Sequence, residues 1–225
     1  MKTTWPILLG LLFLAVPAAV QAQFTYTTNN GAITLAAYSG PGGVVVISNF
    51  VNIIVGGVFS RQTNLTGVTI PGSVTSIGDA AFEGCTNLIN VTIPGSITNI
   101  GNEEFADTGL TNVNMPSSVT SIGDFAFYSS YNLVTVTIPA SVTNIGYDVF
   151  LDCYALANVT NLAGVIGEAE FQQCTSLTNV TINGVTNIPE NAFWDCSSMT
   201  SFTIPGSVTS IGEYAFVLCG KLTNV

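Results

Sequence analysis

The chain alternates apolar and polar positions in short stretches, and these stretches return at a nearly constant interval. Val68, Thr69 and Ile70 are apolar, polar and apolar in turn, which is the pattern of a half-buried strand. Pro71 follows at once and has no N–H for a strand ladder, so the strand is expected to end there. The triplet recurs down the chain, and the sequence therefore predicts one short strand in each repeat of about 22 residues.

A leading Leu or Met marks the start of each repeat at intervals of 21 to 23 residues, which gives seven complete units. A Phe also occupies one fixed position in every unit. One unit is too small to bury its own apolar face, so the units must stack as the rungs of a solenoid, with the Phe residues in one buried column. The leading residues are Leu65, Leu88, Leu110, Leu133, Leu156, Leu177, Met199 and Leu222, and the aromatic residues are Phe82, Phe105, Phe127, Phe150, Phe171, Phe193 and Phe216.

Each unit has a second part after the strand. Val74 and Ile77 form a shorter inward-facing pair, and Gly78 permits a turn. The next six residues, Asp79 to Gly84, are long enough for one helical turn, with Asp79 placed to cap it. We therefore expect short helical or 3₁₀ turns on the side of the rung opposite the strand.

The residues before the repeats divide into two segments. Residues 1–22 contain Lys2, a short apolar run and Val20-Gln21-Ala22, which predict a signal peptide cleaved near Ala22–Gln23. A membrane anchor is the alternative, although the run is shorter than the roughly 20 residues that span a bilayer. Residues 23–53 are predicted to be an N-terminal β cap, with strands at 31–38 and 43–47 around a Gly- and Pro-containing turn.

The solenoid is predicted to cover residues 54–225, and some of its rungs are irregular. Residues 54–65 form a degraded first rung, and the units that begin at Leu156 and Leu177 are shortened after the strand. We expect a local bend or an altered surface at the shortened units. The chain stops at Lys221–Val225 in the opening of another rung, so we expect no C-terminal cap and a natural polypeptide that continues.

The repeat consensus, L-x-x-V-T-I-P-x-S-V-T-x-I-G-x-x-A-F-x-x-C-x-x-L, resembles the BspA-type leucine-rich repeat family of secreted and surface proteins. The resemblance covers residues 65–225, and IPGSVTSIG occurs verbatim at 70–78 and 204–212. It implies an α/β fold, a right-handed leucine-rich-repeat solenoid with a parallel sheet on one face and about seven rungs. It also implies a general association with adhesion and protein–protein contact. It identifies no binding residue, because the motif specifies the scaffold and a fold does not determine a function.

Composition excludes several classes of function. The chain is 48% hydrophobic and 7% charged, which argues against disorder. It has three Lys and Arg against 13 Asp and Glu, so it lacks the basic cluster that nucleic acid binding needs. It has no His, which removes the commonest general base and transition-metal ligand and leaves no Ser or Thr with a His to activate it. We therefore predict a protein that is not an enzyme and has no cofactor and no catalytic residue.

The cysteines all occupy one repeat position, three residues after the Phe. A small residue at a fixed inward site is expected to be a packing choice, because a free Cys behaves as a small hydrophobe. A disulfide between neighbouring rungs, Cys174–Cys196 or Cys196–Cys219, stays open as the alternative for an exported protein. A zinc site is not expected, since the chain has neither His nor a CxxC spacing. The cysteines are Cys85, Cys153, Cys174, Cys196 and Cys219.

Acidic residues also recur, directly after the turn Gly or Pro. The simplest interpretation is that they cap the predicted helical turns. A row of carboxylates that binds Ca²⁺ between rungs is the alternative, although no Asp-rich calcium loop is present and we predict no metal site. The residues are Asp79, Asp124, Glu168, Glu190 and Glu213, with Asn102 at the same position.

The outward positions of the strands form an uncharged ladder of hydroxyl and amide groups. Three interpretations are open: ordinary strand surface, a shallow recognition face for protein or glycan, and a hydroxyl grid that orders water as in ice-binding solenoids. The positions are Asn90, Thr92, Asn112, Asn114, Thr135, Thr137, Asn158, Thr160, Asn179, Thr181, Ser201 and Thr203.

The leading hypothesis is a secreted or cell-surface binding or adhesion module that contacts an extracellular protein or glycan through a rigid repeat scaffold. The alternative is a structural spacer segment of a longer surface protein. An enzyme and an ice-binding protein rank last. The mature chain is expected to contain no transmembrane segment.

Overall fold

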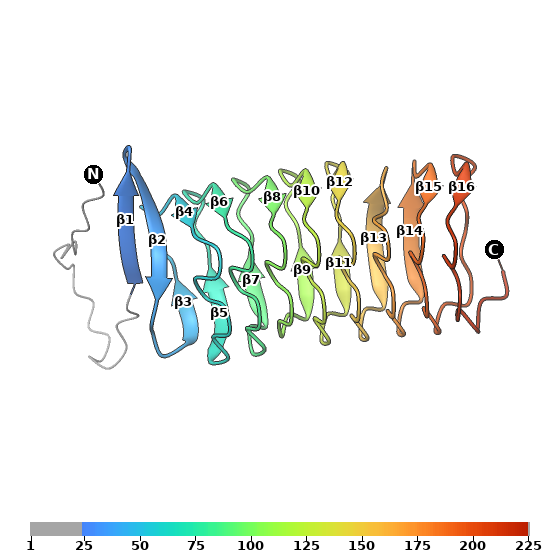
Figure 1. Cartoon of the computed structure of the whole chain (residues 1–225), viewed down its shortest axis with the longest axis horizontal. Coiled ribbons are helices and arrows are strands. Elements are labelled where there is room, and N and C mark those ends of the chain that lie inside the picture. Colours follow the sequence, from blue (N-terminus) through green and yellow to red (C-terminus); the bar gives the residue numbers. More distant parts are fainter. Residues whose placement is uncertain (1–23, 225) are drawn as a thin grey trace.

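The computed structural model describes residues 24–224, apart from the side chains of 161–163, and they form a parallel β-solenoid of about eight turns (Figure 1). The repeat triplets form the first row of strands, two parallel sheets in the orders β3-β5-β7 and β9-β11-β13-β14. Each strand pairs with the equivalent strand of the next rung, for example Val136 with Val113 on one side and Val159 on the other. The row contains β3 Gly43–Val46, β5 Leu65–Thr69, β7 Asn90–Thr92, β9 Asn112–Asn114, β11 Thr135–Thr137, β13 Asn158–Ala163 and β14 Asn179–Asn183. The predicted parallel sheet is confirmed.

A second row of two-residue strands accompanies the first. Ile77 and its equivalents, the shorter inward-facing positions of the repeat, belong to these strands, which also pair in parallel from rung to rung. The sequence predicted a parallel sheet on one face only, whereas the structure has parallel pairing on two. The row contains β4 Ile53–Ile54, β6 Ser76–Ile77, β8 Asn99–Ile100, β10 Ser121–Ile122, β12 Asn144–Ile145, β15 Asn187–Ile188 and β16 Ser210–Ile211.

The segment after each second-row strand is an extended turn and not a helix, and the described residues contain no helix at all. The N–H of Ala80 donates to the carbonyl of Asn102 at 2.8 Å, and that of Phe82 to the carbonyl of Glu104 at 3.0 Å. These bonds run to the next rung, whereas a helix would need partners four residues back in the same segment. Ala80 has a φ of 55°, which is incompatible with a right-handed helix. The predicted helical or 3₁₀ turn, with Asp79 as its cap, is therefore wrong.

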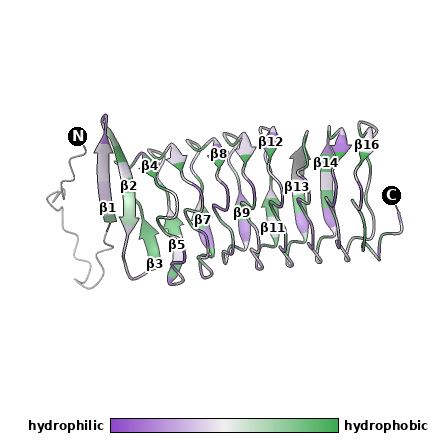
Figure 2. Ribbon diagram, in the orientation of Figure 1, coloured by the Kyte–Doolittle hydropathy of each residue, from purple (hydrophilic) through white to green (hydrophobic). Residues whose placement is uncertain are grey.

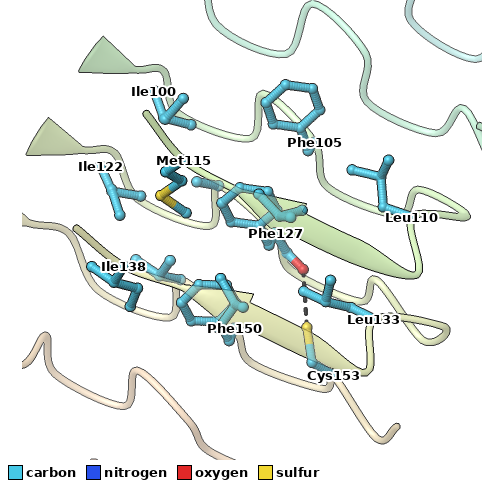
Figure 3. Close-up of a cluster of buried hydrophobic side chains, with 14 of the residues drawn as sticks. Ile100, Phe105, Leu110, Met115, Ile122, Phe127, Leu133, Ile138, Phe150 and Cys153 are labelled. Atoms are coloured by element: carbon cyan, nitrogen blue, oxygen red, sulfur yellow. Dashed lines mark hydrogen bonds between the residues drawn. The ribbon is translucent and has the colours of Figure 1, made fainter. Parts of the chain in front are cut away.

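The Phe residues form the column that the repeat predicts (Figure 3). Neighbouring ring centroids lie 5.1 to 5.6 Å apart and the ring planes lie within 12° of parallel, from Phe59 through to Phe216. All members are fully buried except Phe216, which is partly buried. The column also includes Phe59 of the degraded first rung, so even that rung contributes its aromatic residue to the core.

The N-terminal end contains one more strand than expected. β1 Phe24–Asn29 and β2 Ala32–Tyr38 form an antiparallel hairpin. Asn30 and Gly31 both have positive φ, 49° and 84°, as the two-residue turn of such a hairpin requires. The predicted strands at 31–38 and 43–47 correspond to β2 and β3, but β2 continues the second row through β4 while β3 begins the first row. The predicted signal peptide lies outside the described residues.

The two shortened units differ from the others at the predicted place. β13 has six residues and β14 has five, whereas β7, β9 and β11 have three. The reason is that no Pro follows the triplet in these units, so the strand continues until Gly164 or Gly184, each with positive φ. A hollow of about 470 Å³ lies beside these glycines.

Candidate functional site

The outward side of the first-row strands carries ten residues of the predicted ladder of hydroxyl and amide groups, while Ser201 and Thr203 lie outside the named strands; we call the twelve residues the polar face. Nine of them are exposed, and Thr135, Thr137 and Asn158 are half-buried. The rung-to-rung register brings them into two columns, because Thr135 lies opposite Asn112 and Asn158 while Thr137 lies opposite Asn114 and Thr160. Figure 2 shows the hydrophilic colour on β9, β13 and β14, in contrast to the hydrophobic β3.

Side chains within the polar face hydrogen-bond to one another across rungs. The Thr135 hydroxyl donates to Asn112 Oδ1, and the Asn179 amide donates to Asn158 Oδ1 at 2.8 Å. The hydroxyls of Thr137 and Thr160 lie 3.1 Å apart. These bonds fix side-chain rotamers, so the polar face presents a preorganised array whose groups lose little conformational entropy when a partner binds.

Apolar side chains interrupt this surface, and sequence reasoning missed them. Val44 and Val46 on β3 are 73% and 66% exposed, and Ile89 and Val134, directly before β7 and β11, are 48% and 41% exposed. The signal was available in the sequence, because Ile89 and Val134 occupy a position that is Thr in other rungs, such as Thr66. Uncharged polar groups mixed with exposed apolar ones are a composition typical of protein interfaces.

Three residues of the recurring acidic position, Asp79, Asn102 and Asp124, link rungs instead of capping helices. Asp79 Oδ1 accepts the N–H of Asn102 at 3.0 Å, Asn102 Oδ1 accepts the N–H of Asp124 at 2.9 Å, and Asp124 Oδ1 accepts the N–H of Tyr147 at 3.1 Å. In these three rungs a short side chain with an acceptor oxygen binds the backbone of the next rung, whereas other rungs have Tyr147 or Glu168 at the same position. Among residues 24–224, no group of three or more His, Cys, Asp or Glu side chains is arranged to hold a metal ion.

The cysteines are buried and free in the structure, and each thiol has a specific partner. Cys153 Sγ donates to the carbonyl of Phe127 in the preceding rung at 3.2 Å (Figure 3), and Cys85 makes the same contact to Phe59 at 3.0 Å. Ser130 replaces Cys in its rung and donates to the carbonyl of Phe105 at 3.0 Å. The position therefore selects a small hydrogen-bond donor. Burial raises the pKa of the Cys85 thiol to about 11, which disfavours the reactive thiolate.

Two buried carboxyl groups were also missed. Glu104 and Glu170 are fully buried at the position before the Phe, where most rungs have Ala, such as Ala81. Glu104 Oε2 accepts the N–H of Gly101 at 2.7 Å, and Glu170 Oε2 accepts the N–H of the equivalent Gly167 at 2.8 Å. Their Oε1 atoms have no hydrogen-bond partner. Burial raises the pKa of each carboxyl group to about 8, although the hydrogen bond from the backbone N–H lowers it. Both carboxyl groups are therefore mostly protonated at pH 7.

Within the part of the chain that the structure describes, no helix has the length and apolarity needed to cross a membrane. The parallel strand rows, the Phe column and the repeat of 21 to 23 residues define a leucine-rich-repeat solenoid. The profile of the BspA type leucine-rich repeat region matches residues 52–165 and 157–225, in six copies. The chain belongs to the BspA-type leucine-rich repeat family.

Solved structures of bacterial leucine-rich repeat proteins resemble this one. The T. pallidum leucine-rich repeat protein (TpLRR) is 27% identical, with 90% of this chain and 88% of that chain covered and a TM-score of 0.69. A leucine-rich repeat protein from Bacteroides ovatus is 20% identical, covering 95% and 82%, with a TM-score of 0.38. A leucine-rich cell surface protein from Faecalibacterium prausnitzii is 21% identical, covering 91% and 93%, with a TM-score of 0.39. No curated protein sequence matches the chain.

Proposed function

We propose that the chain is a binding module that contacts an extracellular protein through its polar face. The observation that supports this most is the register of the first-row strands, which aligns hydroxyl and amide groups from successive rungs in two columns. Many weak contacts along a rigid solenoid can give a high total affinity, because the binding groups are already ordered and lose little conformational entropy when the partner binds. Such binding requires no covalent chemistry, and a leucine-rich repeat scaffold is suited to non-covalent interaction with another protein.

The proposal includes location outside the cell, supported by the signal-peptide pattern of residues 1–22. The N-terminal sequence of the exported protein should begin at Gln23. Recovery of the protein with Met1 intact and only inside the cell would contradict this part of the proposal.

Charge introduced on the polar face tests the binding role. Thr137→Lys and Thr181→Lys place bulky cations on two of its strands, β11 and β14. Binding to the partner surface, measured by biolayer interferometry, should weaken by about tenfold or more for the double variant, a loss typical of a residue group central to an interface. Thr186→Lys, an exposed threonine that is not on a first-row strand, is the matched control and should bind normally.

A structural spacer is the second candidate, and the hydrogen bonds among the polar side chains support it. If these side chains only tie neighbouring strands together, as the hydroxyls of Thr137 and Thr160 do, the double Lys variant will show a lower unfolding free energy and unchanged binding. Unchanged binding with unchanged stability would contradict both candidates.

A further inference from the structure

A hollow of about 570 Å³ opens on the edge of the solenoid formed by the turn segments after β6, β8, β10 and β12, away from the polar face. We call it the turn-edge hollow. Most of the side chains that line it are aromatic or acidic, and Ala106, Ser129 and Leu151 complete the lining. The aromatic and acidic side chains include Phe125, Tyr128 and Tyr131 and the carboxylates of Glu83, Glu103 and Asp107.

The aromatic rings are held in place by one another. The Phe125 ring meets those of Tyr128 and Tyr147 edge-on, with centroids 5.8 and 5.0 Å apart. Tyr131 stacks on Tyr154 of the next rung at 5.4 Å. Tyr128 and Tyr131 are nevertheless 36% and 49% exposed. Rings that are fixed and exposed supply contact area at a low entropy cost, which is why Tyr is enriched at binding hot spots.

The scaffold does not require these aromatic residues. Tyr128 and Tyr131 occupy positions that other rungs fill with Gln172 and Thr175. Phe125 adopts a φ of 55°, but the equivalent Ala80 and Asn191 have φ values of 55° and 54°, so this left-handed conformation belongs to the repeat and does not select an aromatic residue. The aromatic residues are thus an addition to the repeat.

The acidic groups of the turn-edge hollow are poorly compensated. Glu83 has partners, because the Ser60 hydroxyl donates to it at 2.9 Å and Arg61, which is 80% exposed, lies 3.6 Å away, but the other two carboxylates have none in the described part of the chain. No side-chain hydrogen bond or ion pair engages Glu103 or Asp107 among residues 24–224. Nearby, burial and the negative charges of Glu168, Asp124 and Asp152, in that order, raise the pKa of Asp148, which shows how closely carboxylates gather on this edge.

We infer that the turn-edge hollow binds a positively charged side chain, Lys or Arg, of a partner protein. Aromatic faces attract a cation by about 0.5–2 kcal/mol, and carboxylates supply charge-assisted hydrogen bonds. A neutral glycan could stack on the rings but would leave Glu103 and Asp107 desolvated without a counter-charge, which is unfavourable. The inference deepens the proposed function, since it names the partner chemistry at a second surface of the same module.

Fluorescence anisotropy with a labelled hexa-arginine peptide tests the inference on the mature chain. Tyr128→Gln with Tyr131→Thr removes the rings and uses residues that the Leu156 unit has at these positions, so the fold should tolerate it. Glu103→Gln with Asp107→Asn removes the charges at nearly constant side-chain volume. Each pair should weaken binding by about fivefold or more, and added salt should weaken wild-type binding. The uncharged hexa-citrulline peptide should not bind.

Matched controls lie in the last rung. Tyr214→Ala and Glu213→Gln remove an exposed ring and a carboxylate there and should change the affinity less than about twofold. Absence of hexa-arginine binding would overturn the inference. Equal losses in the control and hollow variants would also overturn it, because the attraction of the peptide would then reflect net charge alone. Binding of a neutral oligosaccharide that depends on Tyr128 and Tyr131, with peptide binding unaffected, would also overturn it.

The test separates this inference from the proposed function. The Thr137→Lys and Thr181→Lys variant alters the polar face only and should still bind hexa-arginine. Loss of partner binding in that variant, together with hollow variants that bind the peptide normally, would remove the inference and leave the proposed function standing.

Discussion

Glu104→Gln should make the protein more stable at pH 8 and leave it almost unchanged at pH 4.5. The folded chain raises the pKa of Glu104 from 4.5 to about 8 because the carboxyl is fully buried, with the Gly101 N–H lowering it and the charge of Asp79 raising it further. Between these two pH values the unfolded chain loses the proton and the folded chain keeps it. The stability contribution is therefore complete below pH 4.5 and is lost as the pH rises toward 8.

The magnitude follows from the linkage relation. Each pH unit in this window lowers the free energy of unfolding by about 1.4 kcal/mol per group, so the wild type loses about 3 kcal/mol through Glu104 between pH 4.5 and 7. Gln keeps an acceptor for the Gly101 N–H at nearly the same volume but does not titrate. Glu170→Gln should have a similar effect, and the two should add because the sites are three rungs apart.

Urea unfolding followed by circular dichroism from pH 4.5 to 8 measures the effect. The control is Glu103→Gln, the exposed neighbour, because surface carboxylates also repel one another as they ionise. The pH slope should flatten in Glu104→Gln and persist in Glu103→Gln. If both variants keep the wild-type slope, Glu104 is ionised in the folded protein and the reasoning from its burial is refuted.

Two further predictions concern the core. Phe127→Ala removes one ring from the middle of the buried column and should lower the free energy of unfolding by about 3–5 kcal/mol, whereas a change below about 1 kcal/mol would show that the column is not continuous. Excess dithiothreitol should leave the urea midpoint unchanged because the thiols are free, and Cys174→Ser should cost less than about 1 kcal/mol, since Ser130 already fills that position in one rung. A midpoint that falls on reduction would instead demonstrate a disulfide such as Cys174–Cys196.

The sequence predicts the rung, its strand and its aromatic column because these depend on periodic burial. Phe127 is buried in the same way as Phe105 and Phe150, and periodicity alone identifies such positions. The helical turn was a wrong prediction because composition cannot show where an N–H group points. Ala80 and Phe82 donate to the next rung, and only the stacked structure provides those acceptors.

Of the two candidate binding surfaces, the sequence predicts one and not the other. The polar face could be predicted, since strand alternation decides which side chains point outward. The turn-edge hollow could not, because Glu103 and Phe125 come from neighbouring rungs, Tyr131 lies six residues after Phe125, and their proximity depends on the path of each turn. Glu104 was missed although its position is Ala in most rungs, and a departure from the repeat consensus toward a charged residue was the available signal.

The repeat thus assigns stability and recognition to different residues. Residues at recurring positions, such as Asp79 and Cys153, accept hydrogen bonds from the adjacent rung or donate them to it. A substitution there should therefore lower the free energy of unfolding. Positions that vary, such as Tyr128 and Tyr131, meet no such requirement and are free to serve a partner. Substitution of a recurring residue should therefore alter the urea midpoint, while substitution of an exposed varying one should alter affinity at constant midpoint; a buried varying residue such as Glu104 still acts on stability. The polar face is the exception, because Asn112 and Asn158 both tie strands and face solvent, and there the two effects should appear together.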